Sequence, residues 1–545
     1  MSRLLSRSAD LLSIRCKDTS AHKVRSYSSL WTNNKCTLRK HFVYEQNRAI
    51  FTSQRQRIFT FFRSMRSKFW FLGLGAGFAL ALGLKDRVYF SERCECNNTE
   101  NDRSVSASYS TAIETSRDLL QRIKVQDEVA APGIVVGVSV DGTPIWLEGL
   151  GYADLENRVA CGPQTRMRIA SISKPLTAVA VARLWAEGRL DLDAPVQKYV
   201  PEFPEKQFEG EAVTITPRML LSHLSGIRHY EKNAKKVIED KEKAKRLLKP
   251  PERKIKENEK NVENKESPKN KDSGTKSTEA KQKKEFEHEE YYLKESFESV
   301  IHALDLFKDD PLIFKPGTTF LYSTHAYTLL SAVVERVVGQ RFLDHMMKEF
   351  RELGMLNTVP DENDPIIYHR SRFYRFNKKG RVVNCPYVDN SYKWAGGGFL
   401  STVGDLLLFG NAMLYSYQVA HVKNVKGLLP GFLKPETVRA VWAPVDKTEG
   451  SWDKDGLYGM GWLVVEKQQN YGHCRSRRHY VSHTGGAVGA SSVLLVLPSD
   501  PVEPRGNSPV PPKGVVVTII ANMQSVGLNS TALKIAQEFD KARGV

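Results

Sequence analysis

The sequence has 545 residues, of which 41% are hydrophobic, so the chain is long enough for one large domain with additional segments. Its formal net charge is +18. Residues 1–68 hold 15 Lys/Arg and three acidic residues, and residues 231–295 hold 20 Lys/Arg and 16 acidic residues, which leaves only +2 for the rest of the chain. Proteins that bind nucleic acid carry their basic residues on the folded domain. This distribution therefore argues against nucleic acid as a partner.

The first 68 residues have the composition of a targeting sequence. Residues 1–68 are rich in Arg and Ser, poor in acidic residues and interspersed with hydrophobic side chains, which is typical of a mitochondrial transit peptide. An apolar segment of 16 residues follows at 69–84. Because about 20 residues are needed to span a bilayer comfortably, this segment is either a sorting signal that halts import at the inner membrane or a short permanent anchor. The polar residues 85–110 are predicted to form a linker.

A folded domain is predicted over residues 111–545. It begins with a helix at 111–125. Apolar, β-branched runs then flank Asp141-Gly142, and this pair favours a β-hairpin with a tight turn. The apolar stretch that follows is predicted to be a helix over 171–188.

A charged segment at residues 231–295 interrupts this domain. Of its 65 residues 36 are charged, and hydrophobic residues almost vanish between Val262 and Phe286. Such a segment cannot bury enough apolar surface to offset the entropy of ordering it. We predict a solvated helix up to Pro250 and disorder in the rest. Because domain-like sequence resumes afterwards, the segment is interpreted as an insertion.

The C-terminal part of the chain predicts the centre of a sheet. Residues 491–498 and 514–522 are apolar and β-branched and are predicted to be central strands, joined by a Pro-rich loop. A last helix is expected over 530–542. With the hairpin, these elements favour an α/β (α+β) fold: an antiparallel sheet of about five strands flanked by helices, a second, mainly helical region, and a cleft between them.

Ser171 and Lys174 are three residues apart at the start of a predicted helix, so both lie on one helix face. In one interpretation the serine caps the helix. In the other it is a nucleophile with its own base, because a serine hydroxyl attacks poorly until a base removes its proton and burial lowers the pKa of a lysine. The pair by itself does not decide between them.

Two further patterns favour a catalytic site. Tyr322-Ser323-Thr324 follows a Pro-Gly turn and precedes an amphipathic helix, although a core tyrosine followed by a helix cap fits the same letters. His483-Thr484-Gly485 is predicted to end a short strand, and the next residue, Gly486, also permits a ligand to approach the backbone closely. An ordinary glycine turn between strands is the alternative there.

These patterns, S-x-x-K, then Y-S-T, then H-T-G, resemble in this order the serine β-lactamase and penicillin-binding-protein family. The Tyr and His variants resemble its class C and esterase branch. Four further stretches match that family: ITPRMLLSHLSGI at 215–227, RELGMLNT at 351–358, AGGGFLSTVGDLLLFGNAML at 395–414 and YGMGWLV at 458–464. The resemblance spans about residues 111–545, and with its leader and insertion the chain is similar to mitochondrial members of the family.

The resemblance implies a serine hydrolase in which Ser171 is the acylated nucleophile. Lys174 and Tyr322 would share the role of base, with a charged Lys174 favouring the ionised form of Tyr322. Backbone N–H groups of Ser171 and Gly486 would form the oxyanion hole. The residues implied in substrate binding are Thr324, His483, Thr484 and Gly485.

Two positions depart from the family pattern. Thr324 stands where class C enzymes carry Asn, which puts amide contacts to a β-lactam side chain in doubt. His483 stands where Lys is common, and with an ordinary pKa of about 6.5 it is mostly neutral at pH 7. The carboxylate end of a substrate, which His483 and Thr484 would bind, is then held weakly. Antibiotic hydrolysis is therefore not expected as the main activity, and the resemblance implies a serine peptidase or amidase acting on a peptide, an amide or an ester.

No metal ion or other cofactor is expected. His479 and His483 are four residues apart, and on a strand this spacing spans roughly 13 Å, too far for one ion. The run Gly396-Gly397-Gly398 lacks the Lys-Ser/Thr pair of a phosphate-binding loop. The seven cysteines are sparse and include no CxxC pair, so no disulfide framework is predicted.

The resemblance further implies a location in the mitochondrial intermembrane space, assembly into homo-oligomeric filaments and a link to lipid metabolism, and the apolar segment at 69–84 allows association with the inner membrane. A second hypothesis about function is a structural scaffold: a filament-forming protein that retains an enzyme fold without its chemistry. Labelling by a probe for active-site serines distinguishes the hydrolase from the scaffold.

Overall fold

The computed structural model describes residues 109–125, 131–248, 289–421, 430–448, 452–453, 455–469, 476–500 and 512–544. All of them belong to one of the two units into which the chain divides, Asn98–Val545. The predicted transit peptide at 1–68, the apolar segment at 69–84, most of the predicted linker and the middle of the charged segment lie outside the described residues. Among the residues it does describe, no helix combines the length and apolar composition needed to cross a membrane.

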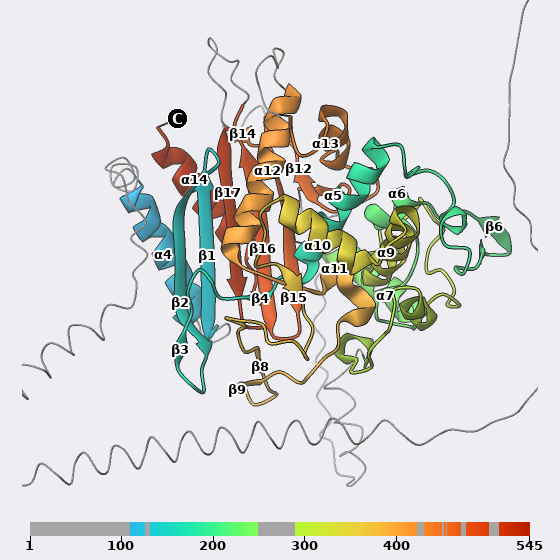
Figure 1. Cartoon of the computed structure of the whole chain (residues 1–545), viewed down its shortest axis with the longest axis horizontal. Helices are drawn as coiled ribbons and strands as arrows, with labels where there is room; N and C mark the ends of the chain where they lie inside the picture. Colours follow the sequence, from blue (N-terminus) through green and yellow to red (C-terminus); the bar gives the residue numbers. More distant parts are fainter. Residues whose placement is uncertain are drawn as a thin grey trace, which may run out of the picture. The chain divides into compact units, whose positions relative to one another are not determined.

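The main sheet is antiparallel and has eight strands in the described part of the chain, in the order β11-β12-β15-β16-β17-β1-β2-β3 (Figure 1). Its strands are β1 (Gly133–Val140), β2 (Thr143–Asp154), β3 (Val159–Ala160), β11 (Leu457–Tyr458), β12 (Leu463–Val465), β15 (Tyr480–Ala487), β16 (Ala490–Pro498) and β17 (Gly514–Ala521). The prediction of about five strands was too low. The additional strands have only two or three residues, too few for an alternating pattern to be visible in the sequence.

Small sheets complete the β-structure. They are formed by β4 (Met167–Arg168), β7 (Val359–Pro360) and β10 (Phe399–Ser401); by β5 (Lys206–Phe208) and β6 (Glu211–Val213); by β8 (Tyr374–Phe376) and β9 (Val382–Asn384); and by β13 (Gln468–Gln469) and β14 (Ser476–Arg477).

In the described part of the chain the α-helices are α4 (Ser110–Val125), α5 (Ser173–Ala186), α6 (Pro217–Leu221), α7 (Ala234–Leu248), α9 (Thr324–Val338), α10 (Phe342–Glu352), α11 (Trp394–Gly397), α12 (Val403–His421), α13 (Pro435–Val441) and α14 (Asn529–Ala542). Short 3-10 helices are η1 (Ala170–Ile172), η2 (Val196–Lys198), η4 (Glu289–Tyr292), η5 (His302–Leu306) and η6 (Ser391–Lys393). The predicted first and last helices are confirmed as α4 and α14.

The predicted hairpin and both predicted central strands are confirmed. Asp141 and Gly142 have φ values of 50° and 83°, and a two-residue turn with positive φ at both positions matches the twist of the strands that it joins. β17 lies between β1 and β16, and every residue of these three strands is buried. Their continuous apolar sequences are explained by layers on both faces of the sheet.

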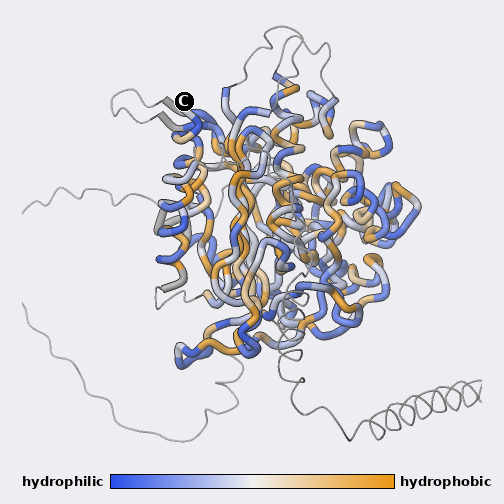
Figure 2. Tube along the Cα trace, turned by 60° about the vertical axis from the view of Figure 1, so that its left-hand side comes forward, coloured by the Kyte–Doolittle hydropathy of each residue, from blue (hydrophilic) through white to orange (hydrophobic). Residues whose placement is uncertain are grey.

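Alternate side chains of the central strands pack into two separate cores. Ile134 and Val136 of β1 pack in the cluster that includes Leu120 of α4 and Phe539 of α14. Val135 packs in the other cluster, with residues of α12 and of the helical region. Helices α4 and α14 therefore cover one face of the sheet and α12 the other, and apolar residues follow the strands between them (Figures 1 and 2).

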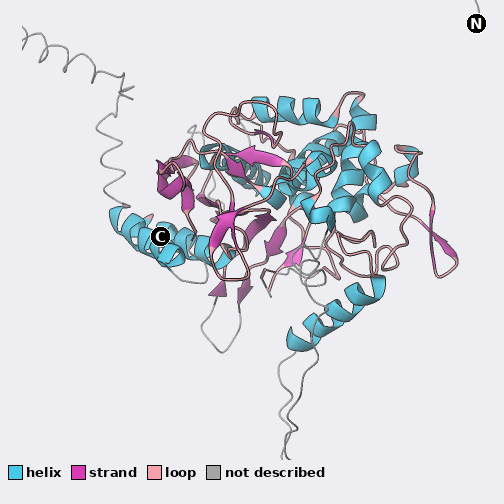
Figure 3. Cartoon of the chain, turned by 90° about the horizontal axis from the view of Figure 1, so that it is seen from below, coloured by secondary structure: helices cyan, strands magenta, loops and turns pink. Residues whose placement is uncertain are grey.

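The second predicted region, mainly helical, lies beside the α12 face of the sheet. Figure 3 shows most helices on one side of the strands, with α4 and α14 on the other. Helix α9 is central to this region, because its first eleven residues are all buried. Its neighbours include α5, α6, α10 and α11.

The charged segment is anchored at both ends by ordered structure. Its first part forms α7, as predicted. The segment was expected to run to residue 295, but the packed chain resumes earlier, at η4, where Glu290 is only 6% exposed. Composition did not reveal this boundary, because one buried acid that is paired with a distant arginine looks like any other acid in a charged sequence.

Candidate active site

Ser171 lies in η1 and not at the cap of a helix. Helix α5 begins at Ser173, with Ile172 at its N-cap, and no side chain makes a capping hydrogen bond there. The preceding residue, Ala170, has φ of 49°, an unfavourable value for a residue with a Cβ. Backbone strain of this kind is concentrated at functional sites. The capping interpretation of Ser171 is therefore wrong, and the turn presents a half-buried hydroxyl to a pocket.

Lys174 lies one turn further along, fully buried in the first turn of α5. Its Nζ is 3.2 Å from Ser171 Oγ and 3.5 Å from Thr324 Oγ1, and it donates a hydrogen bond of 2.6 Å to Gly396 O. Burial, followed by the nearby charge of Lys393, lowers the pKa of Lys174 well below its usual range. A neutral amine beside the serine hydroxyl is able to accept its proton.

Tyr322 stands at the entrance to α9. The next residue, Ser323, caps that helix, its Oγ accepting from the N–H of Ala326 at 3.1 Å. Lys174 Nζ lies over the Tyr322 ring, 4.7 Å from its centre. Burial raises the pKa of Tyr322 above its usual value, and hydrogen bonding with Ser171 offsets this only in part. Burial disfavours the charged form of both groups, whereas the resemblance implied a charged Lys174 beside an ionised Tyr322.

The third predicted pattern lies in the middle of β15 and not at its end. β12 pairs with β15 only from Tyr480 to Ser482, so the backbone beyond Ser482 has no strand partner on that side among the described residues. Thr484 and Gly486 line the pocket, and Gly486 is exposed. Gly485 faces η1, where an added Cβ would collide with Ile169 O. This close approach brings η1, and with it Ser171, against the open part of β15.

The structure does not place His483 in the pocket. Its side chain is fully buried, with Nε2 2.8 Å from the hydroxyl of Tyr458 and Nδ1 2.7 Å from Thr484 O. Burial, with a smaller contribution from Lys174, lowers the pKa of His483 to about 3. His483 is therefore neutral, as its ordinary pKa predicted for pH 7, but it is enclosed behind the strand. Contact with a substrate carboxylate would require it to move.

The pocket between the sheet and the helical region has a volume of about 220 Å³. It brings together Ser171, Tyr322, Thr324, Thr484 and Gly486, five of the residues predicted from sequence. It is also lined by residues that sequence analysis missed: His229, Tyr230, Tyr291, Lys393 and Trp452. None of these belongs to one of the three patterns, and they come from four separate stretches of the chain.

Lys393 gives this pocket a second lysine. It is 5% exposed, and its Nζ lies 4.9 to 5.8 Å from the centres of the Tyr230, Tyr291 and Tyr392 rings. Burial, followed by the charge of Arg168, lowers the pKa of Lys393 to about 7. Only its position just before the Ala395–Leu414 stretch distinguished it in the sequence.

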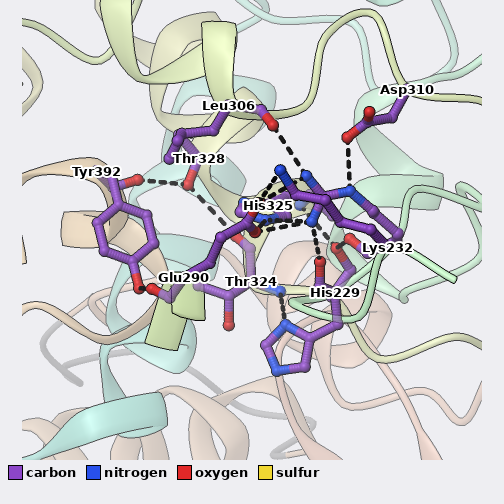
Figure 4. Close-up of polar contacts among 12 residues, drawn as sticks. His229, Lys232, Glu290, Leu306, Asp310, Thr324, His325, Thr328 and Tyr392 are labelled. Atoms are coloured by element: carbon purple, nitrogen blue, oxygen red, sulfur yellow. Dashed lines mark hydrogen bonds and ion pairs between the residues drawn. The ribbon is translucent and has the colours of Figure 1, made fainter. Parts of the chain in front are cut away.

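A buried ion-pair network supports the wall formed by Tyr230 and Tyr291. Arg228 donates to both carboxylate oxygens of Glu290, at 2.7 and 2.9 Å. Glu290 also lies 2.9 Å from His325 Nε2 (Figure 4). These contacts join the two ends of the charged segment to each other and to α9. The two tyrosines, each within two residues of the Arg228–Glu290 pair, are thereby fixed beside the pocket.

This arrangement of sheet, helical region and serine–lysine pair defines a class of proteins. The family model described as Beta-lactamase matches residues 122–527. The structure also resembles that of the penicillin-binding protein homologue from Pyrococcus abyssi, with a TM-score of 0.52 at 20% identity, covering 77% of this chain and 76% of that one. The chain belongs to the β-lactamase family, and the predicted fold is confirmed.

Within this family the chain is most informatively compared with two mammalian proteins. Serine beta-lactamase-like protein LACTB, mitochondrial, from Mus musculus is 64% identical over 450 residues, which cover 80% of this chain and 81% of that protein. The Homo sapiens protein of the same name is 63% identical over 447 residues, with the same coverage. The predicted resemblance to mitochondrial members of the family is thus confirmed.

Proposed function

We propose that this protein is a serine hydrolase that acts through an acyl-enzyme, with a peptide, an amide or an ester as substrate. The observation that carries the proposal is the distance of 3.2 Å between Lys174 Nζ and Ser171 Oγ, with Ser171 lining a pocket. A nucleophile within hydrogen-bond reach of a base is the arrangement that covalent catalysis requires.

In the first half of the reaction, neutral Lys174 accepts the proton of Ser171 as Oγ bonds to the substrate carbonyl carbon. The negative charge that develops on the carbonyl oxygen is stabilised by the backbone N–H groups of Ser171 and Gly486. The bond to the leaving amine or alcohol then breaks. The leaving group takes a proton from Lys174, directly or through Tyr322, and the acyl group stays on Ser171.

In the second half, water releases the acyl group. Lys174, directly or with the Tyr322 hydroxyl as a proton relay, accepts the proton of a water molecule that attacks the acyl carbon, and this proton passes to Ser171 Oγ as the bond between Oγ and the acyl carbon breaks. The burial that lowers the pKa of Lys174 supports this role, because it disfavours the charged amine.

Finer properties are proposed on the family resemblance. Both relatives are named mitochondrial, and we propose a mitochondrial serine peptidase or amidase in the intermembrane space that forms filaments and influences lipid metabolism. Protease protection of intact and swollen mitochondria tests the compartment. Negative-stain electron microscopy of the purified protein tests assembly. A change in lipid composition on removal of the gene, restored by the wild type but not by Ser171→Ala, tests the last property.

The hydrolase itself is tested by covalent labelling with a fluorophosphonate probe. Ser171→Ala is expected to abolish labelling, and Lys174→Ala to slow it by about a thousandfold or more, because an unactivated serine attacks slowly. Ser331→Ala is the matched control. This buried serine on α9 also makes one hydrogen bond, to Thr328 O at 2.6 Å, but it does not line the pocket. Equal labelling of wild type and Ser171→Ala would contradict the proposal and favour a scaffold.

A further inference from the structure

His223 contacts the chain on both sides of Tyr322. Its carbonyl oxygen accepts from the N–H of Leu321 at 2.9 Å. Its side-chain Nδ1 accepts from the N–H of Ser323 at 3.2 Å. The residue between these two amides is Tyr322, so one histidine holds the backbone immediately before and immediately after the tyrosine.

The ring of His223 also packs against the ring of Tyr322. The two ring centres are 4.3 Å apart, the planes are inclined by 42°, and His223 is fully buried. Tyr458 lies 5.0 Å from the same imidazole, so the ring is enclosed by aromatic side chains. With both flanking amides and one face of the ring held, Tyr322 has little freedom to move relative to Ser171.

This arrangement is unfavourable for His223 itself. Its φ is 59°, in the left-handed region that residues with a Cβ adopt uncommonly, although histidine is found there more often than most. Since Nδ1 accepts a hydrogen bond, the proton of the neutral ring is on Nε2, and buried Nε2 has no hydrogen-bond partner among the described residues. A buried donor without a partner costs free energy, so its combination with a positive φ at the residue that contacts both sides of Tyr322 calls for an explanation.

We propose that His223 is a positioning residue that holds Tyr322 in its productive orientation toward Ser171. The proposal rests on the proposed hydrolase function. His223 does not line the pocket, so it acts through Tyr322 and not on the substrate. A displacement of about 1 Å in a catalytic group lowers rates by about a hundredfold, and rigid support by packing and hydrogen bonds prevents such displacement.

Two substitutions of His223 distinguish a role in positioning Tyr322 from a role in merely filling space in the core. Asn and Gly both tolerate positive φ, but only Asn offers an oxygen that can accept from Ser323 N–H. With p-nitrophenyl butyrate as the probe substrate, His223→Gly is expected to lower kcat about a hundredfold and to change KM less than about twofold. His223→Asn is expected to restore kcat to within about tenfold of the wild type.

The matched control is His345→Asn on α10. His345 is also buried, and its Nε2 likewise has no hydrogen-bond partner in the described part of the chain, but it does not line the pocket. This variant is expected to leave kcat unchanged. Equal loss of kcat in His223→Gly and His223→Asn, or a wild-type kcat in His223→Gly, would overturn the proposal.

A second measurement does not depend on activity. Amide hydrogen exchange of the peptide that contains Leu321 and Ser323 is expected to be faster in His223→Gly than in His223→Asn, with β16 and β17 as internal references for global stability. Unchanged exchange in His223→Gly would contradict the positioning role. If the wild type neither hydrolyses the ester nor is labelled at Ser171, the proposed function fails, and the exchange data still decide whether His223 holds Tyr322.

Discussion

Lys174 and Lys393 are buried beside the same pocket, but their environments differ. Lys174 donates to the carbonyl of Gly396 and lies next to the serine hydroxyl. Lys393 lies over the faces of three tyrosine rings, and burial lowers its pKa to about 7. The charge of Lys393 is therefore expected to change near neutral pH.

A pH-dependent contribution of Lys393 to stability follows from this pKa. Lysine in an unfolded chain has a pKa of about 10.4, so between pH ~7 and ~10 the unfolded state binds more protons than the folded state. The free energy of unfolding is then expected to rise with pH over this interval. Lys393→Met removes this pH-dependent contribution to the free energy of unfolding. The Tm of the variant minus the Tm of the wild type should therefore be higher at pH 7 than at pH 9.5.

Differential scanning fluorimetry at the two pH values measures this difference. Lys434→Met is the control, because Lys434 is exposed and lies outside the pocket. Its Tm relative to wild type is expected to stay constant. A constant difference for Lys393→Met as well would mean that Lys393 is not desolvated in the folded protein.

At the scale of elements, the contact between η1 and β15 positions the nucleophile. Gly485→Ala is expected to lower both stability and labelling of Ser171, because the new Cβ would collide with Ile169 O and Ser492 Oγ and push the turn away from the strand. Labelling is expected to fall by at least about tenfold. Denaturant unfolding and the fluorophosphonate probe measure the two effects. Gly527→Ala, where an added Cβ meets open space, is the control, and equal behaviour of the two variants would refute this account.

The Arg228–Glu290 pair joins η4 to the loop before α7. Burial disfavours the Glu290 carboxylate, but hydrogen bonds from His325 and Arg228 outweigh this effect and lower the pKa of Glu290 to about 2. In an unfolded chain the pKa is about 4.3. The stabilisation is therefore fully present above that pH and is lost as the pH falls toward 2.

Removing this carboxylate leaves Arg228 buried without its main partner. Glu290→Ala is expected to lower the free energy of unfolding by about 3–5 kcal/mol at pH 7, with a smaller loss at pH 3, as measured by urea denaturation. Asp305→Ala serves as the control, because the Asp305–Lys308 pair is at the surface and contributes little. A loss for Glu290→Ala no larger than that of the control would contradict the assignment of a buried network.

At the scale of the whole molecule, the pocket is assembled from distant segments. Its lining extends from Ala170 to Ala487, and the charged segment departs and returns beside it. Because the Arg228–Glu290 pair fixes both ends, the length of chain between them is expected to matter little for the pocket. Closing a shorter or longer loop changes the entropy only slowly with length.

Deletion of residues 255–285 is therefore expected to leave Ser171 labelling within about twofold of wild type and to change Tm by only a few degrees. The composition of this stretch, not its structure, motivates the prediction, since it lies outside the described residues. Loss of the fold in the deletion variant would show that the stretch is structural. Loss of labelling with an intact fold would show that it contributes to the site.

Sequence alone determined the features that depend on neighbours along the chain. The Asp141-Gly142 hairpin, the central strands β16 and β17 and the terminal helices are encoded by local turn chemistry and by the spacing of apolar residues. The order of the three patterns around Ser171, Tyr322 and Thr484 gave the family. These features can be predicted from the sequence because each signal lies within a few consecutive residues.

Only the tertiary structure decided which side chains meet and which are desolvated. It placed Ser171 in a 3-10 turn instead of a helix cap, enclosed His483 behind the pocket and brought Lys393 into it. It also paired Arg228 with Glu290 across the charged segment. These outcomes depend on burial and on contacts between residues far apart in the chain, and burial sets the pKa values on which the chemistry depends. The sequence pattern alone indicates neither which groups are buried nor which distant residues are in contact.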